Sequence, residues 1–160
     1  MLNVSVENLE KYLKNCLIRA VDQAAKKTVE YLVEYIQRNW YDKYSPESYK
    51  RTFDFIRSAS KTDATLTGKN EVASMIYFDV SKIKARYYGP GKLNAHAGFD
   101  GASTAEMIPA WIERGHNFIG RGYEKLGSLE ATINMLEKNF PRMVQRELKK
   151  MGLKVQIAQE

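Results

Sequence analysis

The sequence predicts an α+β fold in which two long amphipathic helices and some shorter helices pack on a small antiparallel or mixed sheet. Apolar residues recur at steps of three and four over residues 6–40 and 128–151, which is the spacing of one helix face. Residues 72–80 alternate in the manner of a strand. A chain of 160 residues that is 44% hydrophobic is long enough to bury one core. We therefore expect a single domain over residues 1–160.

The first helix is predicted over residues 6–40. Ser5 is a suitable N-cap, and no glycine or proline interrupts the stretch. At 1.5 Å per residue such a helix is about 50 Å long, which is long for a small domain. We expect part of it to pack on another subunit, or the helix to bend near Ala24 and Ala25. Its apolar side is formed by Leu9, Leu13, Leu17, Ala20, Val21, Ala24, Val29, Leu32, Val33 and Ile36.

The middle of the chain combines a short helix with two strands. Ser45-Pro46-Glu47 has the order of an N-cap, a proline at the first helical position and an early acid, so a helix is predicted from Pro46 to Ser58. A short strand is expected at 64–67, with a turn at 68–70 and a second strand over 72–80. Both faces of that second strand are fairly apolar, which predicts that both are covered, either by helices of the same chain or by a neighbour.

A long loop separates these strands from the second half of the chain. Residues 83–102 carry many Gly, Tyr and Asn residues, and an irregular loop of this length is uncommon unless it is functional. Ser103-Thr104-Ala105-Glu106 matches a capping box, and the regular part of the helix that follows is expected to begin at Pro109 and end near Gly115. Gly120 and Gly122 flank a further turn region.

The last long helix is predicted over residues 128–151. Pro141 should kink it, because proline lacks an N–H and clashes with the preceding turn. Gly152 is a suitable residue just past the helix end, and residues 153–158 alternate as a final strand. The stripe consists of Leu129, Ile133, Leu136, Phe140, Val144 and Leu148.

Composition restricts the partners and the compartment. No stretch reaches the roughly 18 apolar residues of a membrane span, and the first ten residues do not read as a secretory signal. The net charge of +6 suits an acidic partner, although the charges are interspersed. The densest basic cluster is Arg146, Lys149, Lys150 and Lys154, for which helix termination is a better explanation than a DNA site.

Residue types that carry chemistry are sparse. Cys16 is the only cysteine and lies on the apolar side of the first helix, so a buried structural thiol is expected. Neither histidine has a partner at metal-ligand spacing; ordinary surface histidines are favoured over a metal pair of His96 and His116 with Asp100. Gly89-Pro90-Gly91 is interpreted as a turn rather than a phosphate cradle.

A sugar-cleaving site would need two convergent carboxylates. The only acids set in an aromatic run are Asp42, Glu47 and Asp54, which makes an enzyme acting on cell-wall sugar the third hypothesis. The favoured expectation is that the chain is not an enzyme and has no catalytic, cofactor-binding or metal-binding residues.

Basic and aromatic residues interleave in the loops. A protein interface, in which Tyr, Trp and Arg dominate, is favoured over a platform for stacking single-stranded nucleic acid. The predicted partner interface consists of Arg86, Tyr87, Tyr88, Lys92, Trp111, Arg114 and His116, and Arg121 belongs to the same basic and aromatic group.

Three motifs occur in a fixed order along the chain. The first helix leads into Trp40-Tyr41-Asp42-Lys43-Tyr44-Ser45-Pro46 and Tyr49-Lys50-Arg51-Thr52, the strand 72–80 follows, and Trp111-Ile112-Glu113-Arg114-Gly115-His116 comes after the long loop. Together they resemble the head–tail joining and tail-completion family of long-tailed bacteriophages and prophages, which includes minor capsid and tail-component proteins. Many members have a proline and then a T-G-x-L-type segment; this chain has Arg51-Thr52-Phe53-Asp54-Phe55 there, without the glycine.

The resemblance implies a non-catalytic α+β subunit of a ring, commonly of six, at the junction between head and tail. Its partners would be further copies of itself and neighbouring connector, tail-tube or tail-terminator proteins, with DNA only as cargo through the channel and no membrane. Its location would be the virion, after assembly in the host cytoplasm. The alternative is a nucleic-acid-binding protein that uses its basic surface.

Overall fold

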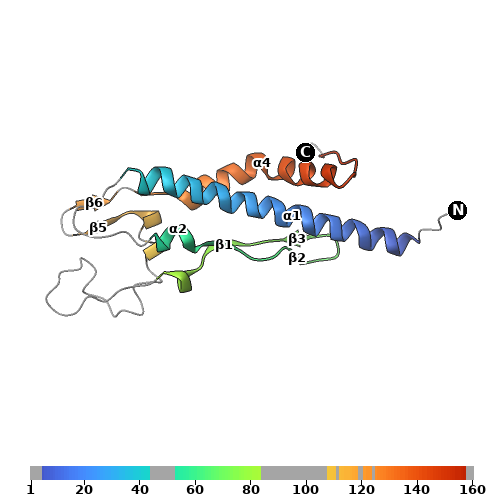
Figure 1. The fold of residues 1–160 in the computed structure, drawn as a ribbon, viewed down its shortest axis with the longest axis horizontal. Coiled ribbons are helices and arrows are strands. Elements are labelled where there is room, and N and C mark those ends of the chain that lie inside the picture. Colours follow the sequence, from blue (N-terminus) through green and yellow to red (C-terminus); the bar gives the residue numbers. More distant parts are fainter. Residues whose placement is uncertain are drawn as a thin grey trace. The chain divides into compact units, whose positions relative to one another are not determined.

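The computed structural model describes residues 5–43, 53–83, 108–110, 112–118, 121–123 and 125–157. Its elements are α1 (Val6–Ile36), the π-helical η1 (Gln37–Tyr41), α2 (Asp54–Ser58), β1 (Ala59–Lys61), β2 (Thr65–Leu66), β3 (Val72–Ala73), β4 (Ile76–Phe78), the 3-10 helix η2 (Val80–Lys82), β5 (His116–Phe118), β6 (Arg121–Tyr123) and α4 (Ser128–Lys150). Residues 108–110 and 112–114 are also helical. Strand β1 pairs with β4, β2 with β3 and β5 with β6. The predicted α+β class is confirmed (Figure 1).

The chain forms two compact units. Unit 1 comprises residues 1–30, 61–76 and 133–160, and unit 2 comprises residues 31–60 and 77–132. The prediction of one domain stays a prediction. The predicted helix 6–40 is confirmed as α1 with η1, and the α-helix runs unbroken through Ala24 and Ala25, whose small side chains are buried.

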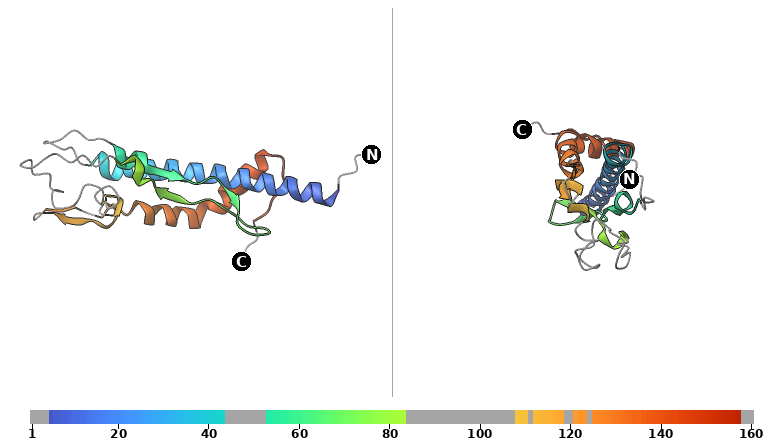
Figure 2. Two further views of the ribbon diagram at one scale, coloured as in Figure 1. Left: turned by 90° about the horizontal axis from the view of Figure 1, so that it is seen from below. Right: turned by 90° about the vertical axis from the view of Figure 1, so that its left-hand side faces the viewer.

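The core of unit 1 lies between α1 and α4, which run in opposite directions side by side (Figures 1 and 2). Cys16, Ala20 and Leu148 form its centre, which confirms the buried thiol. Leu17, Val144, Met151, Leu153 and Val155 pack around them. The ribbon of α4 bends between its orange and red parts, in keeping with the predicted kink at Pro141 (Figure 2).

The predicted strand at the C-terminal end does not form over residues 153–157. Gly152 has a φ of +82°, and the amides of Gly152 and Leu153 bond to the carbonyls of Lys149 and Leu148, at 3.0 and 3.2 Å. This is the Schellman arrangement that ends a helix. It turns the chain back so that Leu153 and Val155 pack on the Leu148 cluster, and Gln145 Nε2 donates to the carbonyl of Val155 at 2.8 Å. The alternation therefore reflects packing on α4 rather than pairing with a strand.

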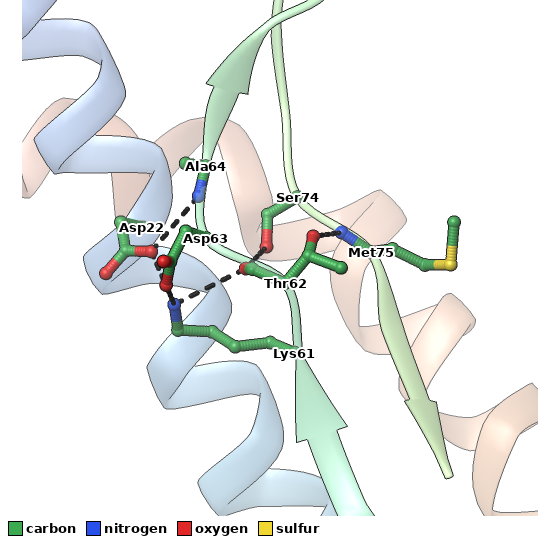
Figure 3. Close-up of polar contacts among 7 residues, drawn as sticks. All are labelled: Asp22, Lys61, Thr62, Asp63, Ala64, Ser74 and Met75. Atoms are coloured by element: carbon green, nitrogen blue, oxygen red, sulfur yellow. Dashed lines mark hydrogen bonds and ion pairs between the residues drawn. The ribbon is translucent and has the colours of Figure 1, made fainter. Parts of the chain in front are cut away.

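The predicted strand 72–80 is divided into β3 and β4. Between β3 and β4, the side chains of Thr62 and Ser74 form hydrogen bonds with the backbone across the hairpin. Thr62 Oγ1 accepts from the Met75 amide at 2.9 Å, and Ser74 Oγ donates to the Thr62 carbonyl at 2.7 Å (Figure 3). Val80 belongs to η2, which Asp79 caps by accepting from the Ser81 amide. Within this chain only one face of these strands is partly covered, since Met75 on the other face is 64% exposed. Cover of that other face by a neighbour stays a prediction.

Asp22 fixes the hairpin of unit 1 to α1. Its carboxylate accepts from the Ala64 amide at 3.3 Å and pairs with Lys61 (Figure 3). The hydrogen bond from Lys61, and then the one from Ala64, hold the pKa of the Asp22 carboxyl below its usual range. The strand predicted at 64–67 is confirmed as β2.

Unit 2 builds its core around α2. The ring of Phe55 lies 4.8 Å from that of Phe78, and the buried Ser58 hydroxyl donates to the Phe55 carbonyl at 2.6 Å. The helix predicted over 46–58 is wrong at Phe53, where φ is +57° and α2 begins only at the next residue. A left-handed residue cannot continue a right-handed helix. Residues 44–52 lie outside the described part of the chain.

The region around Gly120 and Gly122 forms a hairpin that the sequence did not predict. Strands β5 and β6 pair antiparallel, with His116 opposite Tyr123 and Phe118 opposite Arg121. The long loop predicted at 83–102 lies outside the described residues apart from Ile83, and so does the capping box at 103–106.

Candidate assembly surfaces

Most of the predicted partner interface falls outside what the structure describes. Arg86, Tyr87, Tyr88, Lys92 and Trp111 are not among the described residues. Arg114 is exposed, and His116 begins β5, although its side chain is not described. The interface built on these residues stays a prediction.

Glu113, beside Arg114, has a structural role that the sequence did not predict. It is 9% exposed; its Oε2 accepts from the Leu129 amide at 3.0 Å and its Oε1 accepts from the buried Ser128 hydroxyl. A carboxylate in this place satisfies the free amides at the start of α4 and complements the helix dipole. The Leu126 and Gly127 amides bond back to the carbonyls of residues 112 and 113, at 3.1 and 3.3 Å. The glutamate of the third sequence motif therefore anchors α4 within unit 2.

The N-terminal turns of α1 carry a bare apolar surface. Ser5 caps the helix as predicted, since its Oγ accepts from the Asn8 amide at 3.3 Å. Residues 5–13, here named the α1 tip, are all exposed. They include Val6 at 82%, Leu9 at 49% and Leu13 at 43%, with Tyr12 beside them. The dark-blue end of α1 extends past β2, β3 and the red end of α4 (Figures 1 and 2).

The tip continues the stripe that is buried further along the same helix. Val6, Leu9, Leu13, Cys16 and Ala20 follow one another at steps of three and four. The last two belong to the core of unit 1, whereas the first three are exposed. The same side of one helix is therefore covered at Cys16 and Ala20, which cluster with Leu148 of α4, and exposed before them.

A second apolar surface lies within unit 1, between α1 and α4. It is an open pocket of about 390 Å³, named here the α1–α4 pocket. Its lining includes Val21 and Ala25 of α1, Ile76 of β4, and Leu136, Glu137 and Phe140 of α4. Pro141 also lines it, so the kink in α4 and the opening occur at the same place. The volume falls in the range of about 300–1,000 Å³ that is common for binding clefts.

The exposed apolar residues of α4 lie toward its start. Ile133 is 55% exposed, while Leu148 near the other end is buried. The predicted stripe of α4 is therefore covered near the C-terminal end and open near the N-terminal end. Within unit 2, the buried positions at the start of α4 are instead Ser128 and Thr132, and the Thr132 hydroxyl donates to the Ser128 carbonyl at 2.7 Å.

Glu147 forms a buried charge contact within unit 1. Its carboxylate is buried and accepts from Lys27 of α1 and from Lys150 at 3.0 Å. The hydrogen bond from Lys27, and then that from Lys150, lower the pKa of the Glu147 carboxyl. This contact links α1 to α4. Lys150, which belongs to the basic cluster near the C-terminal end, therefore takes part in an ion pair within the unit.

Candidate metal ligands do not converge in the part of the chain that the structure describes. Across those residues, no three His, Cys, Asp or Glu side chains are placed to hold a metal ion. Asp42 accepts from Gln37 Nε2 at 2.6 Å, while Glu47 and His96 lie outside the described residues. Among the described helices, none has the length and apolar character needed to cross a membrane.

The chain matches a family model over nearly its whole length. Residues 5–158 match the model of the YomN family. No curated protein and no solved structure matches the chain. Since the matched region covers nearly the whole sequence, the chain belongs to the YomN family, which is derived from Bacillus phages and prophages, and it is a phage-associated protein.

Proposed function

We propose that this protein is a structural, non-enzymatic virion subunit: a ring-forming head–tail connector or tail-completion protein of a tailed phage. It assembles in the host cytoplasm with further copies of itself and with connector, tail-tube or tail-terminator neighbours. DNA is cargo in the channel of the ring rather than a ligand. The observation that carries the proposal is the bare apolar stripe of the α1 tip.

An exposed apolar stripe of this kind is unfavourable in water for a protein that remains a monomer. Val6, Leu9 and Leu13 present apolar surface to water on one side of a helix, and contiguous exposed apolar surface is typical of interaction sites. Ring subunits leave such surface for a neighbour to cover. The phage origin of the family supports the proposal that this neighbour is a component of a phage particle.

Phe53 adds support to the resemblance on which the connector role rests. Many members of the head–tail joining family that the sequence resembles have a glycine after the threonine, and here Phe53 follows Thr52. Its φ of +57° lies in the left-handed region that glycine adopts without strain. The backbone therefore takes the shape that a glycine would provide, although the glycine is missing.

Removing the gene from a phage that carries it tests the role directly. A connector is needed only to join finished parts, so the lysate should contain DNA-filled heads and complete tails that remain separate in electron micrographs. Restoring the gene in trans should restore joined particles. Normal particles without the protein would contradict the proposal.

Nucleic-acid binding is the second candidate, and one observation favours it. Exposed basic residues gather toward the C-terminal end of α4: Arg142, Arg146, Lys149, Lys150 and, just beyond the helix, Lys154. If this surface binds DNA, the logarithm of the association constant should fall linearly with the logarithm of the salt concentration, and replacing two of these residues should reduce the slope. Lys150 already pairs with Glu147, which weakens this reading.

A further inference from the structure

We propose that the α1 tip of one copy docks in the α1–α4 pocket of the next copy. The inference rests on the proposed ring and names the surface by which its subunits join. The tip supplies an amphipathic helix end, and the pocket supplies an apolar cleft. An amphipathic helix laid in an apolar groove is a recurrent way for proteins to bind, with anchors one turn apart.

A tip that docks in this pocket must come from another molecule. Val21 and Ala25 of the pocket belong to the same unbroken helix as Leu9 and Leu13 of the tip. A straight stretch of helix holds them apart by about 1.5 Å per residue and cannot fold back on itself. The tip therefore cannot reach the pocket that its own helix lines, while a second copy can supply a tip of the same sequence.

The two surfaces also match in size and chemistry. A pocket of about 390 Å³ has room for apolar side chains rather than a single water molecule of about 30 Å³. Its lining is apolar except for Ser74 and Glu137. Leu9 and Leu13, one turn apart on the tip, are anchors of a kind that such a lining can bury.

Charges flanking the two surfaces are complementary. Glu7 and Glu10 are exposed on the tip, one turn apart. On α4, Lys138 and Arg142 are exposed one turn apart, next in sequence to the pocket residues Glu137 and Pro141. Acids facing bases across a helix pair favour one register and speed association.

A contact of this kind is heterologous, because different surfaces of the two copies meet. Repeating it places each tip in the following pocket, and it either closes into a ring or continues as a filament. Tip-to-tip pairing would instead be isologous and would end at a dimer. This difference makes the arrangement testable with two variants.

The test mixes a copy with a blocked tip and a copy with a blocked pocket. Leu9→Asp puts a charge on the stripe, and its control Asn8→Asp adds the same charge at a neighbouring exposed position. Glu137→Trp fills the pocket from an exposed position, and its control Asn134→Trp adds the same side chain to an exposed part of α4 outside the lining. Masses are measured by light scattering, with circular dichroism confirming that each variant is folded.

The expected result is that Leu9→Asp and Glu137→Trp each weaken self-association by roughly ten- to a hundredfold, while both controls associate like the native chain. Mixing the two blocked variants should yield a one-to-one dimer and nothing larger, because one intact tip meets one intact pocket. The proposal is overturned if Glu137→Trp alone still dimerises, if the mixture stays monomeric, or if the native chain never associates.

These outcomes separate the docking from the proposed function. Native rings that persist in both blocked variants would leave the connector role standing on another interface. Joined phage particles formed without the protein would end the connector role, whatever the masses show.

Discussion

The two ends of α1 contrast sharply although both carry leucines on an apolar side of the helix. Leu32, in the part of α1 that belongs to unit 2, is fully buried, whereas Leu9 on the tip is 49% exposed. Nothing in the residue type distinguishes them, since both are leucines at inward spacing in a continuous helix. What differs is whether the same chain supplies the covering surface. An amphipathic pattern therefore shows which side of a helix is apolar, but not whether the same chain or another molecule packs on that side.

The largest effect on the free energy of unfolding is expected at the buried end of α1, around Leu32. Leu32→Ala should lower the free energy of unfolding by about 2–5 kcal/mol, because it removes apolar surface and leaves a cavity. Denaturant unfolding followed by circular dichroism measures this loss. A cost below about 1 kcal/mol would mean that this end of α1 is not a packed core.

Charge pairs offer a second comparison between the two ends. Glu147→Gln should cost roughly 1.5–3 kcal/mol, because hydrogen bonds from Lys27 and Lys150 to a buried carboxylate are lost. Glu10→Gln on the tip breaks the exposed pair with Lys14 and should cost at most about 0.5 kcal/mol. Equal costs in chemical denaturation would contradict the buried setting of Glu147.

The same carboxylate predicts a dependence on pH. Because the pKa of Glu147 is lowered in the folded protein, its contribution to stability is complete above the ordinary value of 4.5 and disappears as the pH falls through the lowered value. Asp22 and Asp79, whose pKa values are also lowered, add to the loss at still lower pH. Unfolding curves from pH 7 to 3 should show a steeper decline for the native chain than for Glu147→Gln. Parallel declines would count against the pairing.

Phe53 is an exposed aromatic residue that the chain partly covers itself. Its ring stacks on Tyr41 at 4.8 Å while its backbone is left-handed. Phe53→Val should cost about 1–3 kcal/mol, because a β-branched residue is strained at that φ. Phe53→Gly should cost less, since relief of strain offsets part of the lost stacking of about 0.5–1.5 kcal/mol. Thermal unfolding of the two variants gives the order, and the reverse order would contradict the strained geometry.

The smallest effect on stability is expected at the tip. Leu9→Ala should change the free energy of unfolding of the monomer by less than about 0.5 kcal/mol, because this side chain is exposed in the described part of the chain. The measurement requires a concentration low enough to avoid association. A loss as large as that of Leu32→Ala would mean that the tip is covered internally, and the contrast between the two ends would fail.

Local features of the chain were predictable where local chemistry determines them. Ser5 as a cap, Gly152 as the residue past α4 and the burial of Cys16 all follow from near neighbours in sequence, and the structure confirms them. The break in the strand at Ser74 was not predictable, because it depends on Thr62 across the hairpin. Long-range hydrogen bonds of side chains leave no periodic signal.

The features of the candidate surfaces also divide into those that the local sequence predicts and those that depend on distant residues. Glu113 stood in a motif that the sequence singled out, yet its contact with Leu129 crosses from one element to another and could not be read from spacing. The tip was visible as an amphipathic pattern, but its exposure depends on where α4 ends. The sequence signalled this exposure only through the length of the helix, since a helix of about 50 Å is longer than a small core can cover.

The central claim is that the α1 tip joins copies of this protein, and the mass in solution over a concentration series tests it most directly. Light scattering should show the native chain and Asn8→Asp growing from monomer to a closed ring, with rings visible in negative stain, while folded Leu9→Asp stays a monomer throughout. If Leu9→Asp and the native chain have the same mass at every concentration, the tip is not the joining surface.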